Sequence, residues 1–171
     1  MNSLVREGMM VDEGKVDSTG GRKASAFGLN PGAAYFLGVE IRKGYMNISL
    51  MDFAKSIQHQ QAHIPFQLEN TAASFAAFIR GIKQFLWQHT ISLNSIKHCE
   101  VAVSGKINQR TGQSFNTFNF LEGSLAQSIE QEISIPTNLE NNARAMAWAK
   151  VNAGENQGEK NTLLLNLDHG I

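Results

Sequence analysis

Hydrophobic and polar residues follow two different periods along most of this chain. A largely apolar run over residues 35–41 suits a buried strand, and the alternation over residues 45–52 predicts a second strand. Residues 56–64 form a weaker third strand, so the three together predict an antiparallel meander. Between residues 71 and 89, apolar side chains recur at helical spacing and predict a helix with one buried stripe: Phe75, Phe78, Ile79, Ile82 and Leu86.

The second half of the chain alternates shorter strands and helices around an ordered polar loop at residues 106–120. Strands are predicted at 99–103, 137–140 and 161–167, and helices begin near Ser124 and Asn142. The resulting order βββαβαβαβ predicts an α/β fold with a mixed sheet. A meander followed by α/β crossovers is typical of one lobe of the actin-like, ribonuclease H-like architecture. Because the chain stops soon after a strand, we expect it to be a fragment of a longer protein.

Composition narrows the class of protein without naming a function. The 171 residues contain 42% hydrophobic side chains, which supports a packed core. Lys and Arg together number 15, as do Asp and Glu, so no overall field attracts nucleic acid or an anionic membrane. One cysteine, Cys99, cannot form an internal disulfide, and no signal peptide or membrane-spanning run is present. These features predict a cytoplasmic protein with no membrane partner.

The first 30 residues differ from the rest of the chain. A helix tail stops near Gly8, residues 11–17 suggest a short hairpin, and residues 18–23 form a Gly-rich stretch that ends in two cations. This segment is too short to bury a core of its own. We interpret it as the remnant of a small module or linker, with the main domain starting near Pro31.

The junction between the strand 137–140 and the next helix carries three polar residues, Glu140, Asn141 and Asn142. In open α/β sheets, ligands bind where strand ends meet helix N-termini, because both present unpaired polar groups there. Helix capping is a second role for the two asparagines, and it is compatible with ligand contact. We therefore expect this corner to face a ligand.

Four short motifs in order along the chain resemble the ROK family, which combines sugar kinases with sugar-responsive transcriptional repressors. Residues 8–31 are similar to the exit of the winged-helix DNA-binding domain in the family's repressors. Residues 101–107 resemble the loop at the family's sugar site, and residues 140–143 resemble its Glu-Asn-Asp-Ala corner. Residues 168–171 resemble the start of its second phosphate-binding turn.

The resemblance implies an actin-like ATPase first lobe over residues 31–171, truncated before the second lobe. A remnant of the winged-helix module and its linker would precede it over residues 1–30. The implied ligand-binding residues are Ser104, Gly105, Asn119, Glu140, Asn141 and Asn142, although Asn119 is as well explained as a turn residue. A DNA-contacting arm, with a solvated linker as the alternative, would consist of Gly20, Gly21, Arg22 and Lys23.

Two departures from the family's kinase pattern bear on activity. Family kinases have Asp as the general base at the third corner position, whereas Asn142 offers an amide that has no useful basicity. Their first phosphate turn reads Asp-x-Gly-Gly-Thr, whereas residues 40–44 read Glu-Ile-Arg-Lys-Gly here. We therefore expect no catalytic residues and no kinase activity, but a sugar-responsive repressor of which this chain forms half of the sugar-binding cleft.

The resemblance also implies the partners: a sugar or sugar phosphate, DNA through the missing winged helix, and a second copy of the full-length protein. No cofactor is expected in this chain, because the family's zinc motif belongs to the second lobe. His59 and His63 lie in a strand-like segment, where they would not converge on one metal ion. Two alternatives stay open: an ATP-dependent, glucokinase-like sugar kinase fragment, and a degenerate interaction module with no ligand.

Overall fold

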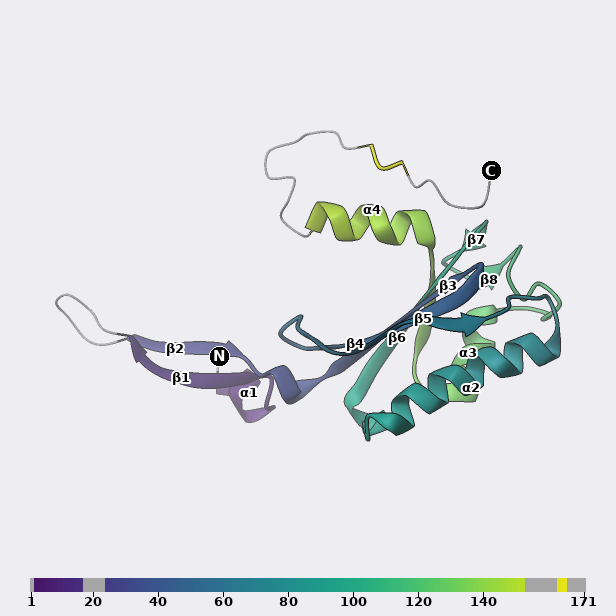
Figure 1. The fold of residues 1–171 in the computed structure, drawn as a ribbon. Coiled ribbons are helices and arrows are strands. Elements are labelled where there is room, and N and C mark those ends of the chain that lie inside the picture. The colour runs from purple at the N-terminus through teal and green to yellow at the C-terminus, as the bar shows by residue number, and fades with distance from the viewer. Residues whose placement is uncertain (1, 17–23, 153–162, 166–171) are drawn as a thin grey trace.

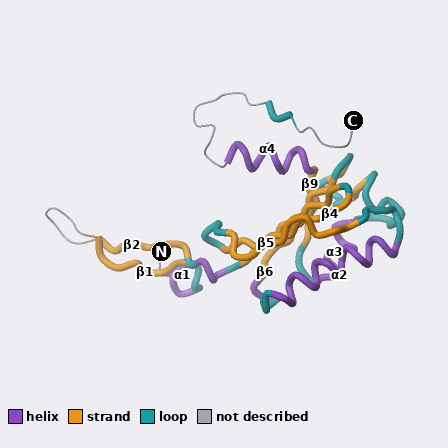
Figure 2. Tube along the Cα trace, in the orientation of Figure 1, coloured by secondary structure: helices purple, strands orange, loops and turns teal. Residues whose placement is uncertain are grey.

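The computed structural model describes residues 2–16, 24–152 and 163–165. Its main body is a five-stranded mixed sheet with helices on both faces, and a two-stranded hairpin projects from one end (Figures 1 and 2). The strands of this sheet are β3 (Tyr35–Arg42), β4 (Gly44–Asp52), β5 (Ile57–Phe66), β6 (Ile96–Val103) and β9 (Thr137–Asn141). The helices around it are α2 (Ala72–Gln88), α3 (Leu125–Ile133) and α4 (Asn142–Asn152).

The strand order of this sheet is β5-β4-β3-β6-β9. Antiparallel pairing of β3 with β4 and of β4 with β5 confirms the predicted meander. β6 pairs in parallel with β3, and β9 pairs in parallel with β6. Because β3, β6 and β9 run in the same direction, their carboxyl ends meet at one edge of the sheet, where α/β folds bind ligands.

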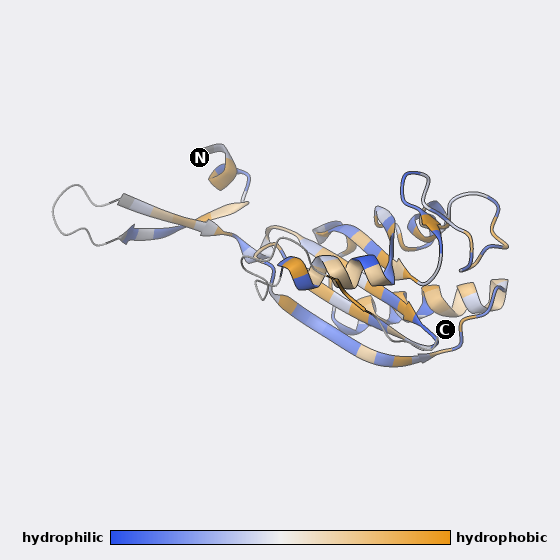
Figure 3. Ribbon diagram, turned by 90° about the horizontal axis from the view of Figure 1, so that it is seen from above, coloured by the Kyte–Doolittle hydropathy of each residue, from blue (hydrophilic) through white to orange (hydrophobic). Residues whose placement is uncertain are grey.

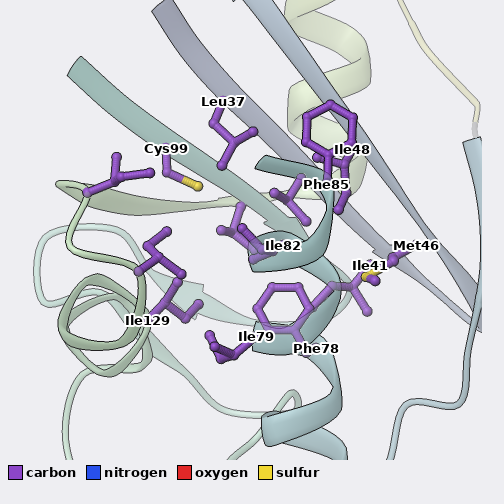
Figure 4. Close-up of a cluster of buried hydrophobic side chains, with 14 of the residues drawn as sticks. Leu37, Ile41, Met46, Ile48, Phe78, Ile79, Ile82, Phe85, Cys99 and Ile129 are labelled. Carbon is purple, nitrogen blue, oxygen red and sulfur yellow. The ribbon is translucent and has the colours of Figure 1, made fainter. Parts of the chain in front are cut away.

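One face of the sheet packs against α2 and α3 and forms the hydrophobic core (Figure 4). Alternate residues of β3 and β4 are buried, as a strand with one covered face requires. Four residues of the predicted α2 stripe are buried, whereas Phe75 is partly buried, and Phe85 joins the core although the pattern had not singled it out. Burial raises the pKa of the Cys99 thiol to about 12, so this side chain packs in the core as a small hydrophobe.

The opposite face of the sheet carries α4, which lies above the strands in Figure 1 and is seen from above in Figure 3. The predicted helix over residues 142–152 is confirmed, but among its 11 residues only Asn142 is buried. Trp148 and Val151 are 71% and 55% exposed. Since α4 buries little apolar surface, its contacts at the N-terminus contribute much of what holds it in place.

The N-terminal segment consists of α1 (Asn2–Arg6) and a hairpin of β1 (Met10–Val16) and β2 (Ala24–Leu29). The hairpin predicted within residues 11–17 is wrong, because residues 11–16 all lie in the single strand β1, whose antiparallel partner is β2. Within residues 2–16 and 24–29 there is one five-residue helix and one hairpin, and no complete winged-helix domain. The 3₁₀ helix η1 (Pro31–Ala33) leads from this segment into β3.

Two segments of the second half differ from the sequence pattern. The polar loop over residues 106–120 contains a short hairpin of β7 (Ile107–Asn108) and β8 (Gln113–Ser114), and the 3₁₀ helix η2 (Leu93–Ser95) precedes β6. The strand predicted over residues 161–167 is described only at 163–165, which form no strand, and the motif at 168–171 lies outside the described residues. In the described part of the chain, no helix combines the length and apolar content that a membrane crossing requires.

Candidate ligand-binding site at the end of β9

Asn141 caps α4. Its Oδ1 accepts hydrogen bonds from the backbone N–H groups of Ala143 at 3.0 Å and Arg144 at 3.2 Å. These are two of the N–H groups that the first turn of a helix leaves without an intrahelical partner. The Asn141 Nδ2 donates to the Gly105 carbonyl at 2.9 Å, so the same side chain ties the start of α4 to the loop after β6.

Asn142, the first residue of α4, follows the cap and is 5% exposed. Its Nδ2 donates to the Ile41 carbonyl at the end of β3, 3.1 Å away, and to the Ser104 Oγ just after β6, also 3.1 Å away. The side chain therefore bridges the ends of three parallel strands. Its Oδ1 is buried, and no donor from the described residues lies within hydrogen-bond distance of it.

Both carboxylate oxygens of Glu140 have partners within the chain. Oε1 accepts from the Asn141 backbone N–H at 2.7 Å and lies 3.5 Å from the Arg144 Nε. Oε2 accepts from the Gln109 side chain, which belongs to the loop between β7 and β8. Glu140 thus holds that loop against the start of α4. Sequence reasoning missed Gln109, because nothing in a polar loop marks which amide will meet a partner 31 positions away.

The loop after β6 is shaped around Gly105. This residue has φ +91°, and a Cβ atom there would come within 2.6 Å of the Asn116 Oδ1. The same Oδ1 accepts the backbone N–H of Lys106 at 2.9 Å. A side chain at position 105 would therefore be strained by its backbone angle and would also displace the bond that fixes the loop.

The structure brings together five of the six predicted ligand-binding residues through direct hydrogen bonds: Ser104, Gly105, Glu140, Asn141 and Asn142. The sixth, Asn119, has no such bond to them. It is exposed, its backbone N–H donates to the Asn70 Oδ1 at 3.3 Å, and its Nδ2 reaches the Phe115 carbonyl at 3.5 Å. The bond to Phe115, four positions away, fits the alternative role of Asn119 as a turn residue, and the bond to Asn70 ties this turn to the start of α2.

The turn between β3 and β4 lies within residues 40–44, which the sequence resemblance predicts to correspond to the first phosphate turn of family kinases. Arg42 pairs with Tyr45 across it, and Gly44 with φ +87° supplies the positive φ that a tight turn needs. Glu40 accepts from the Arg42 Nε at 2.8 Å with one oxygen and from the Asn47 Nδ2 at 2.8 Å with the other. Arg42 also reaches the Met146 sulfur on α4 at 3.2 Å. The Arg42 side chain thus runs from this turn to α4.

A cavity of about 400 Å³ lies beside this corner, between α4 and the face of β6 and β9. Its lining includes Glu100, Gln109, Glu140 and the exposed Trp148. Burial raises the pKa of Glu100 above its ordinary value, the nearby Glu140 charge adds to the rise, and the partner His98 opposes it. Carboxylate, amide and indole groups suit polar hydroxylated ligands. Glu140 belongs both to this lining and to the predicted ligand-binding residues, so the cavity adjoins those residues.

A larger groove of about 870 Å³ lies at the other edge of the sheet, where α2 and α3 end and the chain approaches β6. It contains Trp87 and Ile91 and none of the predicted ligand-binding residues. The corner at β9 remains the better candidate, because the buried Asn142 amide and the polar groups of its neighbours converge there. The DNA-contacting arm predicted at residues 20–23 lies outside the described residues. Among residues 2–16, 24–152 and 163–165, no three His, Cys, Asp or Glu side chains gather as a metal site would need.

Comparison with known proteins decides the family, because the ROK family model matches residues 36–171. The chain belongs to the ROK family. A xylose repressor from Bacillus subtilis (strain 168) is 25% identical over 174 residues, which cover 100% of this chain and 44% of the repressor. This ROK chain therefore spans less than half the length of that relative.

Solved structures agree with the ROK fold. A ROK family transcriptional regulator, a homologue of the E. coli MLC protein, aligns with a TM-score of 0.66 at 15% identity and covers 87% of this chain and 38% of that chain. A candidate N-acetylmannosamine kinase from Listeria monocytogenes aligns with a TM-score of 0.52 at 19% identity, over 68% of this chain and 38% of that one. The predicted actin-like first lobe is thus confirmed as the fold, which regulators and kinases share.

Proposed function

We propose that this ROK chain forms half of the sugar-binding cleft of a sugar-responsive transcriptional repressor. The similarity to a xylose repressor runs over the whole chain, including the segment before residue 36 that the family model leaves out. Ser104, Gly105, Asn141 and Asn142 would form the wall of the cleft, with Glu140 positioning them. Ligand binding would shift the equilibrium between two arrangements of the whole protein and so change its affinity for DNA.

One observation carries the choice of a sensor over an enzyme. The Asn142 amide stands at the corner position where a kinase needs a base, and its Nδ2 is bonded to a backbone carbonyl. An amide cannot accept the proton of a sugar hydroxyl during phosphoryl transfer. The turn at residues 40–44, with its Glu40–Arg42 pair, likewise lacks the adjacent glycines that let backbone N–H groups cradle a phosphate.

DNA binding would use the N-terminal segment as part of a complete winged-helix domain, which residues 2–16 and 24–29 do not form by themselves. The hairpin β1–β2 has the form of a wing, and the residues Gly20, Gly21, Arg22 and Lys23 fall between its two strands. In this proposal, the Arg of that arm enters the minor groove beside the winged helix. The repressor would bind a two-fold operator as a homodimer in the cytoplasm.

The experiment uses the whole gene product that carries these residues and a labelled DNA fragment from its own promoter region. D-xylose, D-glucose and D-mannose are titrated while DNA affinity is followed by fluorescence anisotropy. One of the sugars is expected to change the DNA dissociation constant by about 5- to 150-fold, the usual range of allosteric coupling. Sugar binding with no change in DNA affinity would contradict the proposal.

An ATP-dependent sugar kinase is the second candidate, favoured by the shared fold with a candidate N-acetylmannosamine kinase. Incubation of the whole gene product with ATP and the same sugars distinguishes the two, because sugar phosphate forms only if the kinase reading holds. The variant Asn142→Asp is expected to restore no activity, since the turn at residues 40–44 is altered independently of the corner. Product formation by the wild-type protein would favour the kinase, whereas product from Asn142→Asp alone would show that the turn at residues 40–44 still supports phosphoryl transfer.

A further inference from the structure

The groove of about 870 Å³ at the ends of α2 and α3 has an apolar floor. Leu86 and Ile133 belong both to its lining and to the hydrophobic core, and the partly buried Ile91 packs against that core. Leu93, which is 44% exposed, adds an apolar rim. A hollow of this size and lining suits a large aromatic or aliphatic side chain, because covering it removes apolar surface from water.

A tryptophan stands beside this groove with most of its surface in solvent. Trp87 is part of the lining and is 79% exposed. It lies in the last turn of α2, outside the stripe of buried residues that packs against the sheet. Tryptophan is enriched among the few residues that carry most of the binding energy of protein interfaces. A hollow and a protruding indole lie side by side here, so this face can be complementary to a second copy of itself.

The charges of this face permit two identical copies to meet. The charged residues of its lining are Lys83 on α2 and Glu132 on α3, and their side chains pair at 3.2 Å. This pair leaves the lining formally neutral, so a second copy would meet no net repulsion. A strongly cationic or anionic partner would gain little electrostatic attraction from such a lining. The charge pattern therefore favours a second copy of this chain over a highly charged partner.

The groove lies at the end of the lobe from which the N-terminal hairpin projects (Figure 1). β3 begins at Tyr35, soon after η1, and Tyr35 pairs with Ile96, the first residue of β6. Leu93 of the groove belongs to the 3₁₀ helix η2, which directly precedes Ile96. A two-fold axis at the groove would therefore bring the attachment points of both hairpins to the same end of a dimer. Paired DNA-binding segments on a two-fold operator need this kind of arrangement.

We propose that this face pairs two copies of the chain about a two-fold axis, with Trp87 of each copy inserted into the groove of the other. Both contacts form together, since an isologous interface uses the same patch on the two copies. The interface goes beyond the proposed function, because the pairing itself needs no sugar. It names the surface that the homodimer of that function would use.

Sedimentation velocity on the 171-residue chain measures this pairing directly. A dimer is expected to form at concentrations up to about 100 μM, since interfaces of standard size reach micromolar or tighter affinity. Trp87→Lys is expected to weaken dimerisation on the order of 100-fold or more, because each dimer loses two indoles and gains two charges. Trp148→Lys makes the same change at a tryptophan of α4 that is 71% exposed, and it is expected to leave the dimer intact.

Fluorescence gives a second readout that needs no disruptive variant. The chain contains two tryptophans, so Trp148→Phe leaves Trp87 as the single reporter. The emission of Trp87 is expected to shift to shorter wavelength, and its quenching by acrylamide to weaken, as protein concentration rises. In the matched variant Trp87→Phe, the emission of Trp148 is expected to stay independent of concentration. Should Trp87→Lys fail to fold, this pair of variants still decides whether Trp87 becomes buried.

Three results would overturn the proposal: a chain that stays monomeric over this range, a dimer that Trp87→Lys leaves unchanged, and a dimer in which Trp87 emission does not depend on concentration. None of them bears on sugar sensing, because the sugar-dependent change in DNA affinity is measured separately on the whole gene product. Conversely, a dimer that pairs through Trp87 without any sugar response in DNA binding would refute the proposed function and leave the interface standing.

Discussion

Three consecutive side chains at the end of β9 have separate tasks. Glu140 holds the loop that carries Gln109, Asn141 caps α4, and Asn142 bridges to Ile41 and Ser104. The bridge explains why an amide suits position 142 in this chain, because its N–H groups match a carbonyl and a hydroxyl oxygen. A carboxylate there would face the Ile41 carbonyl with a second acceptor.

The variant Asn142→Asp is therefore expected to lower the free energy of unfolding by about 1–3 kcal/mol at pH 7, the usual cost of an unsatisfied buried polar group. Urea unfolding followed by circular dichroism measures the change. Asn138→Asp carries the same change of charge at an exposed position of β9 and is expected to have little effect. Equal stability of the two variants would show that the bridge to Ile41 contributes nothing.

Glu100 gives the corner a pH dependence. Because burial raises its pKa above the ordinary 4.5, the folded chain holds this proton more tightly than the unfolded chain does. The resulting stabilisation is complete below pH 4.5 and is lost as pH rises through the raised value. The melting temperature of Glu100→Gln, relative to that of the wild type, is thus expected to increase as pH rises from 4 to 7.5. The exposed Glu132→Gln serves as the control. A difference that shrinks with rising pH would show that the pKa of Glu100 is not raised in the folded chain.

At the scale of elements, α4 depends on its N-terminus more than on its packing. It buries one residue, while α3 buries four and α2 buries six. Its cap, Asn141, is also tied to Gly105, so fraying of α4 would loosen the loop after β6. The capping role of Asn141 is therefore structural even if the residue also meets a ligand.

Asn141→Ala is expected to destabilise α4 by about 1 kcal/mol, the typical cost of a lost N-cap. Hydrogen exchange should show faster exchange at the amides of α4 and unchanged exchange in α2. Asn141→Asp keeps an acceptor at the cap and favours the helix dipole but loses the bond to the Gly105 carbonyl, so α4 should be better protected in it than in Asn141→Ala. Uniform acceleration over the whole chain in Asn141→Ala would contradict a local role.

The sequence pattern predicts these elements well where burial alone defines them. The alternation in β3 and β4 and the stripe of α2 follow from one covered sheet face, so their ranges were predictable within a few residues. The details of the corner were not predictable, because they depend on bonds between distant segments, such as Asn142 to Ile41 and Gln109 to Glu140. The error at residues 11–17 has the same origin, because the strand that pairs with β1 lies further along the chain, at β2.

At the scale of the whole molecule, the N-terminal hairpin and the α/β lobe are distinct in their packing. No described residue before Ala34 belongs to the buried core, and the hairpin projects from the end of the sheet in Figure 1. Asn30 links the two parts through hydrogen bonds to Gly8 and Met9. In the proposed repressor, a segment attached in this way would transmit a change of the lobe to DNA without contributing to the core.

Removal of residues 1–29 is expected to leave the melting temperature of the remaining chain within about 4 °C of the original, since about 1 kcal/mol shifts a domain of this size by that much. Differential scanning calorimetry measures it. Removal of residues 1–37, which also takes away the buried Ala34 and Leu37 and the start of β3, is the control and should destabilise the lobe strongly. A large drop for the shorter deletion would show that the hairpin is part of the lobe.

We propose that this ROK lobe recognises a sugar without phosphorylating it. One sample of the whole gene product tests both halves of this proposal when it is saturated with the sugar that it binds in calorimetry and supplied with magnesium and labelled ATP. We expect full occupancy by the sugar and no transfer of label to it above the level of a blank without protein. Label that appears in the sugar at a rate proportional to protein concentration would show instead that the protein is a kinase.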